Sequence, residues 1–249
     1  MAVPLGAAPP TGGPPGYTYG ALAVRGSDQP DRLLAALRAI GFSGWVAPPA
    51  DGWGIAVPAR AAGTVAAGRR GLLEVGAGLA SQLGTTVIAV RVLRDRQLVL
   101  AVWAGGHEVG RYVSDPAYGL DDKDVLPSPL GAEHAAAFAA ALDKPEVAGQ
   151  LEDLLLEELD ADSVIESERL ADVLRMLGLP RWLISSASLP RDVPGGPRAR
   201  DLTRLGAGVP GVPGRLLGGA VDVVRNRRPP PPVVADPPRA APGMDPWLF

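Results

Sequence analysis

The most strongly patterned part of this chain is TTVIAVRVLRDRQLVLAVW, which runs from Thr85 to Trp103. Its two halves, residues 85–93 and 97–103, are nearly continuous aliphatic runs separated by Arg94-Asp95-Arg96. Strands of such composition are buried on both faces of their sheet. Because a three-residue connection is too short for a crossover, the two strands must pair antiparallel. The stretch therefore predicts two interior, neighbouring strands.

Working outward, the sequence predicts a βαββαβββ order. Apolar and aromatic runs indicate further strands at residues 17–25, 44–47, 53–57 and 108–114. Helical spacing of leucines with Gly41 as a stop, and a second periodic segment ending at Gly84, indicate helices at residues 30–40 and 70–83. The first six elements match the split βαβ arrangement, and the last two strands extend it as a meander. Both helices are then expected on one face of the sheet.

Three C-terminal helices are expected to cover the second face. They are predicted at residues 128–142, 147–159 and 163–177, the last opening with a capping box at Ser163. The fold class predicted is thus α+β, an α/β sandwich with a mixed, mainly antiparallel sheet.

Composition divides the chain into three parts. Residues 190–249 hold 13 of the 27 prolines, with nine arginines and five aspartates, while the preceding residues have a net charge of −7. A Pro-rich segment with few aromatics buries too little apolar surface to fold alone. We expect a flexible arm at residues 1–16, one globular domain at 17–187 with a helical part at about 128–185, and a disordered Pro/Arg-rich tail at 188–249.

The same composition argues against several classes of protein. An acidic body without a basic face is not expected to bind nucleic acid. Without cysteine there is no disulfide framework or thiol nucleophile, and neither His107 nor His134 stands at a metal-ligand spacing. No metal or other cofactor, no membrane span and a cytoplasmic location are expected. The excess of arginine over lysine is typical of a high-GC genome, such as that of an actinobacterium.

Aromatic residues supply the first candidate binding surface. Trp45 and Trp53 flank a Pro-Pro-Ala-Asp-Gly loop, where Asp51 precedes the turn glycine. Trp247 and Phe249 are large apolar anchors in a segment otherwise rich in proline and arginine. Aromatics of this kind are enriched in protein interfaces. The alternative for the first pair is a core role, with both tryptophans pinning a hairpin.

The loop at residues 114–124 supplies the second candidate. It holds four aspartates, and Tyr112 and Asp115 stand where a strand ends. Carboxylates can bind hard cations, but the spacing does not fit a calcium-binding EF-hand loop. Tyr112, Asp115 and Asp121 around one cavity would indicate an enzyme, with or without a bound metal ion.

Two functions from different classes remain. We expect a non-catalytic protein-binding module, such as an adaptor, regulatory or immunity-type protein, whose partner is another protein and whose tail is a tether or docking arm. The absence of a recognisable catalytic constellation and the acidic body favour it. The alternative is the enzyme with the acidic-loop site.

Overall fold

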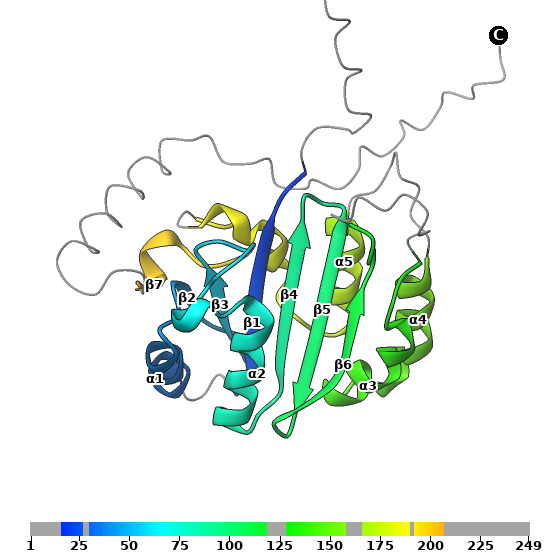
Figure 1. Cartoon of the computed structure of the whole chain (residues 1–249), viewed down its shortest axis with the longest axis horizontal. Helices are drawn as coiled ribbons and strands as arrows, with labels where there is room; N and C mark the ends of the chain where they lie inside the picture. The colour runs from blue at the N-terminus through cyan, green and yellow to red at the C-terminus, as the bar shows by residue number, and fades with distance from the viewer. Residues whose placement is uncertain (1–15, 27–29, 119–127, 158–165, 190–191, 207–249) are drawn as a thin grey trace, which may run out of the picture.

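The computed structural model describes residues 16–26, 30–118, 128–157, 166–189 and 192–206, which form an antiparallel sheet of seven strands with helices on both faces (Figure 1). The strands are β1 (Tyr19–Arg25), β2 (Gly44–Ala50), β3 (Trp53–Pro58), β4 (Val87–Leu93), β5 (Gln97–Ala104), β6 (His107–Val113) and β7 (Thr203–Leu205). The α-helices are α1 (Pro30–Ile40), α2 (Leu72–Leu83), α3 (Ala135–Ala141), α4 (Ala148–Leu156) and α5 (Glu166–Met176). The 3-10 segments are η1 (Ala67–Arg69), η2 (Ala132–His134), η3 (Pro145–Val147), η4 (Arg181–Ser188) and η5 (Ala199–Asp201).

The strand order is β6-β5-β4-β1-β3-β2-β7. Its centre, β4-β1-β3-β2 with α1 and α2 as connections, is the expected split βαβ unit. Strand β5 lies between β4 and β6, with Val90 opposite Leu100, so the two strands that we expected to be interior are interior. The predicted α+β class is confirmed.

Helices α1 and α2 cover one face of the sheet, as the sequence predicted. Their buried Leu37 and Leu79 pack in one cluster with Leu22 of β1 and Trp103 of β5. A methyl group in place of the Gly76 hydrogen would lie 2.8 Å from the Trp103 ring, so this glycine allows α2 to approach the sheet closely.

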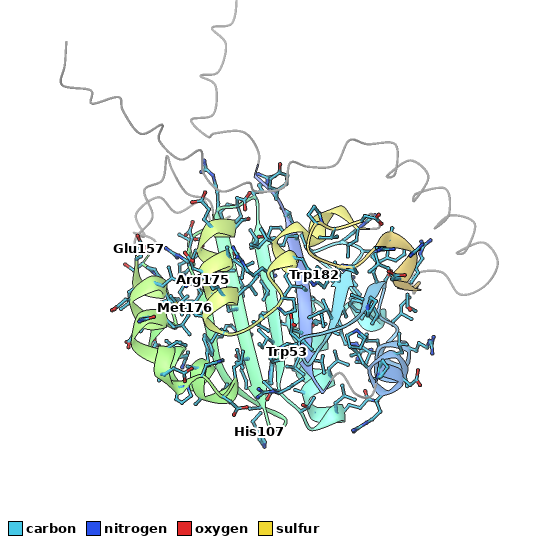
Figure 2. The ribbon with its side chains drawn as sticks, turned by 180° about the vertical axis from the view of Figure 1, so that it is seen from behind. Trp53, His107, Glu157, Arg175, Met176 and Trp182 are labelled. Carbon is cyan, nitrogen blue, oxygen red and sulfur yellow. The ribbon has the colours of Figure 1, made fainter. Side chains whose placement is uncertain are left out.

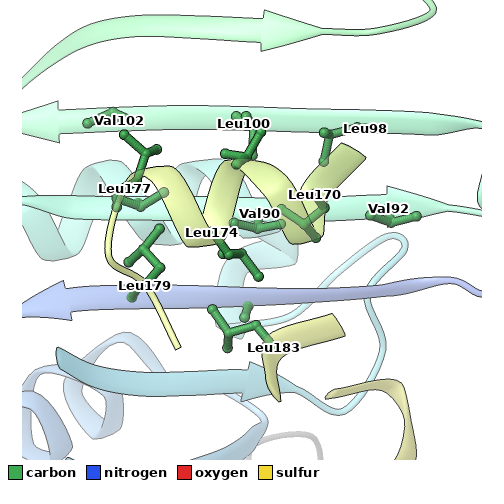
Figure 3. Close-up of a cluster of buried hydrophobic side chains, with 14 of the residues drawn as sticks. Val90, Val92, Leu98, Leu100, Val102, Leu170, Leu174, Leu177, Leu179 and Leu183 are labelled. Carbon is green, nitrogen blue, oxygen red and sulfur yellow. The ribbon is translucent and has the colours of Figure 1, made fainter. Parts of the chain in front are cut away.

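The C-terminal helices cover the other face (Figure 2). Leu170 and Leu174 of α5 lie over the sheet in the same apolar cluster as Val90 and Leu100 (Figure 3). Segment η4 continues this layer through Leu183, and α3 and α4 extend it beside β6. Since β4 and β5 are covered on both faces, their continuous apolar sequence is explained.

The helix expected from residue 128 begins later than predicted. Residues 128–131 are not helical, and Leu130 instead forms a bridge with Val113 at the end of β6. Gly131 has a φ of +86° and sits so close to the Arg111 carbonyl that no side chain would fit. The helical turns therefore start only at Ala132.

The sheet also includes residues beyond the domain boundary expected at 187. Strand β7 pairs with β2, with Leu205 opposite Gly44, and both Val193 and Leu205 are buried. A three-residue strand among prolines carries no periodic pattern, so it could not be predicted from the sequence. Residues 1–15 and 207–249, where we expected disorder, lie outside the described residues.

Candidate functional site

Strands β1 and β3 separate at one end of the sheet, and Pro58 accounts for it. Their ladder stops at Leu22 and Ala56, whereas the ladder between β1 and β4 continues to Tyr19 and Val92. The register would place Pro58 opposite Gly20, but proline has no N–H to donate to a ladder. Beyond Leu22, β1 therefore has a paired strand on its β4 side only, within the described sheet.

The separation leaves a pocket of about 340 Å³, which we call the β1–β3 notch. Its lining comes from residues 18–20, Trp45, residues 57–62 and Leu189, which follows η4. The volume lies in the range of small-ligand sites, roughly 300–1,000 Å³. The notch is thus a partly apolar pocket that lies beside the unpaired side of β1.

Arginines flank the notch. The guanidinium carbon of Arg204, on β7, lies 5.4 Å from the centroid of the half-buried Trp45 ring, which is a cation–π contact. Arg60 is exposed and lines the pocket directly. The mouth of the notch therefore combines an aromatic face with positive charge.

Tyr19 forms a fixed wall of the notch, because its hydroxyl is held from behind. It donates a hydrogen bond of 2.8 Å to Ser167 Oγ on α5, and Ser167 in turn donates to Asp95 Oδ1. Asp95 Oδ2 accepts the Tyr17 N–H at 2.9 Å. Burial raises the pKa of Tyr19, so the phenol stays protonated and acts as a donor. The arrangement fits positioning rather than proton transfer.

A second buried polar cluster lies deeper, around Tyr112. Its hydroxyl donates to the Leu155 carbonyl of α4 at 2.9 Å and accepts from Arg169 Nη1 at 2.5 Å. Arg169 Nη1 is also 3.6 Å from Glu166 Oε1. Burial raises the pKa of Glu166, while a hydrogen bond from Ser114 and the Arg169 charge oppose the rise. Among the described residues, Glu166 Oε2 and Arg169 Nε have no hydrogen-bond partner.

Of the acidic-loop residues, the structure describes Tyr112 and Asp115, and it places them in different surroundings. Tyr112 points into the protein toward α4 and α5, whereas Asp115 Oδ1 accepts the N–H of Ala117 in its own turn at 2.9 Å. Asp121 lies outside the described residues. Within the described ranges, no group of three acidic or histidine side chains could hold a metal ion.

The two hairpin tryptophans occupy different environments. Trp53 is buried, with the guanidinium carbon of Arg25 5.6 Å from its ring centroid, and Arg25 pairs with Asp143 at 2.7 Å. Trp45 stands at the other end of the hairpin, in the notch. Asp51 is exposed at the turn with a φ of +52°. Trp53 is thus a core residue, whereas Trp45 is half-buried and lines the notch.

Sequence reasoning does not single out Tyr19, Ser167 and Asp95 at the notch, or Glu166 and Arg169 beside Tyr112. In the sequence, Asp95 stands in a short turn, and Glu166 stands three residues after Ser163, at the closing position of the predicted capping box. Ser163 lies outside the described residues. The available signal was polar residues on the side of α5 that carries Leu170 and Leu174. Trp247 and Phe249 also lie outside the described residues.

Comparison with known proteins gives no relative: no family model, no curated protein and no solved structure matches the chain. None of the helices described here is both long and apolar enough to cross a membrane.

Proposed function

We propose that this chain is a non-catalytic protein-binding module that takes up an extended segment of a protein partner in the β1–β3 notch. We place it in a bacterial cytoplasm, on the grounds of its cysteine-free, arginine-rich composition. Its role is that of an adaptor, regulatory or immunity-type protein.

One observation carries the proposal: β1 loses its β3 partner at the place where Trp45 and Arg204 stand. An unpaired strand side accepts an extended peptide by main-chain hydrogen bonds, and adjacent pockets select its side chains. Tryptophan and arginine are the side chains most often found at the energetic centre of interfaces. The notch thus offers an extended peptide both backbone hydrogen bonds from β1 and a side-chain contact with Trp45.

The chemistry of the lining supports binding rather than catalysis. The described lining has no carboxylate and no imidazole, so it offers neither of the usual general bases. The Thr18 hydroxyl already accepts the Arg94 N–H at 3.0 Å. The exposed Arg60 is suited to holding an acidic group of the partner.

Site-specific photo-crosslinking tests the proposal. A benzophenone amino acid replaces Trp45 in one variant and His107, exposed at the opposite end of the sheet (Figure 2), in the control. Irradiation in the source cells should give an adduct with another protein from position 45 and not from position 107. No protein adduct from position 45, or equal adducts from both, would refute the assignment of the notch.

The second candidate is an enzyme at the acidic loop, in a metal-dependent or a metal-free form. It is favoured by the buried carboxyl of Glu166, whose pKa is raised and which lies near Asp115 and Tyr112. Titration calorimetry with Mg²⁺ and Mn²⁺ tests the metal-dependent form. Heat of binding that disappears in Asp121→Asn and persists in Asp51→Asn would favour this candidate; no binding would remove that form.

A further inference from the structure

We propose that residues 244–249, Met-Asp-Pro-Trp-Leu-Phe, dock into the β1–β3 notch of their own chain and compete there with the partner. This inference rests on the proposed function of the notch as a peptide site. It adds a regulatory ligand, supplied in cis, to that site.

The end of the described chain lies at the notch. Strand β7 pairs with β2 and sets Arg204 over Trp45, and the described residues end at Gly206, two positions later. Residues 207–243 connect this point to Met244. At about 3.3–3.6 Å per extended residue, their contour length is on the order of 100 Å, so reach does not limit docking.

The segment matches the notch in chemistry. Trp247 and Phe249 are the only aromatic residues after Leu205, and Asp245 is the only charged residue of the segment. An acidic, apolar segment is complementary to an aromatic hollow flanked by Arg60 and Arg204. Residues 207–243, in contrast, carry five arginines and would meet like charge there.

Backbone geometry favours the same segment. Pro246 biases Asp245 toward an extended conformation, which is the conformation needed to pair with the open side of β1. A pocket of 340 Å³ accommodates an anchor side chain rather than six residues. We assign that anchor to Trp247, with Asp245 placed to meet an arginine.

Tethering makes a weak contact effective. A segment linked to its own site experiences an effective concentration on the order of 1 mM. If the free segment binds with a Kd of about 0.1 mM, the notch is occupied in about nine of ten molecules. A competing ligand then binds about tenfold more weakly than it would to an open notch.

The test measures binding of a fluorescein-labelled, C-terminally amidated peptide of residues 240–249 to the full chain by fluorescence anisotropy. The chain carrying Trp247→Ala and Phe249→Ala should bind it about tenfold more tightly than the wild type. The matched control, Leu216→Ala with Leu217→Ala, changes two apolar residues in the same part of the sequence and should behave as the wild type. A peptide with Asp245→Lys should bind more weakly to every chain.

Two further variants locate the site. Trp45→Ala and the exposed Arg60→Glu, each added to the Trp247→Ala/Phe249→Ala chain, should both abolish the gain, with thermal melts to establish folding. Absence of peptide binding, equal affinity of the wild type and the Trp247→Ala/Phe249→Ala chain, or binding insensitive to Arg60→Glu would each overturn the proposal. An adduct with another protein from position 45 would then still support the proposed function. Failure of tail docking can therefore be distinguished from failure of the notch as a partner site.

Discussion

Glu166 is an ionisable residue that folding removes from water. It is buried at the start of α5, and its Oε2 has no hydrogen-bond partner in the part of the chain that the structure describes. The groups that face it are Ser114, Arg169, Asp115 and Asp95. Burial outweighs the favourable contacts with Ser114 and Arg169, so the pKa of the carboxyl is raised. The folded protein therefore holds this proton more tightly than the unfolded chain does.

Glu166→Gln should consequently change the pH dependence of stability. The contribution of the protonated carboxyl is fully present below the unfolded pKa, about 4.3, and is lost as pH rises through the folded pKa. Glutamine does not titrate, so the melting temperature of the variant relative to the wild type should increase from pH 4 toward neutral pH. Glu152→Gln, on the exposed side of α4, should leave the curve unchanged. Parallel curves for Glu166→Gln and the wild type would contradict the argument.

For single residues, the sequence predicted only part of the candidate site. It identified Tyr112 as a candidate but not its partners, because Arg169 and Glu166 come from a helix more than fifty residues away along the chain. Trp45 and Trp53 are equivalent in sequence, each beside the same loop. Only the ends of the β1–β3 ladder decide that one lies in the core and the other in the notch.

Among the elements, α2 provides a matched pair of glycines. A Cβ added to Gly76 would lie 2.8 Å from the Trp103 ring. A Cβ added to Gly78 would have Ile40 as its nearest neighbour, at 4.0 Å. Both lie inside the helix, where glycine costs about 1 kcal/mol relative to alanine.

Gly78→Ala should therefore stabilise the protein by up to about 1 kcal/mol through the lower entropy of the unfolded chain. Gly76→Ala should destabilise it by about 1–3 kcal/mol, since α2 must move away from the sheet. Urea unfolding of the two variants beside the wild type measures both. Changes of the same sign would mean that α2 is not held against Trp103.

The elements were predicted where burial leaves a pattern. Continuous apolar runs marked β4 and β5, and leucine periodicity marked α1 and α5. Strand β7 and the separation of β1 from β3 left no such pattern. Strand β7 forms by pairing with β2 across more than 150 residues of sequence. The separation of β1 from β3 depends on the register that places Pro58 opposite β1, and a local sequence pattern does not reveal that register.

At the scale of the whole molecule, two helical layers enclose the sheet, and the last described residues complete it at the β2 edge. Residues 192–206 follow the segment that we expected to end the domain, yet Val193 and Leu205 are buried at 5% and 7% exposure. The folded unit should therefore extend at least to Gly206 rather than end near residue 187.

Two shortened chains test this boundary. A chain ending at Leu189 loses Val193 and Leu205, and burial of two such side chains contributes about 3 kcal/mol or more. A chain ending at Gly206 keeps both and should lose only the stabilisation from residues 244–249 docked in the notch, about 1.4 kcal/mol for a tenfold effective excess over Kd. Urea unfolding should thus rank the full chain first, the chain ending at Gly206 a little below it, and the chain ending at Leu189 well below both. If the two shortened chains unfold together, β7 is not part of the cooperative unit; the full chain carrying Leu205→Ala, expected to lose about 2 kcal/mol or more, checks the same point without truncation.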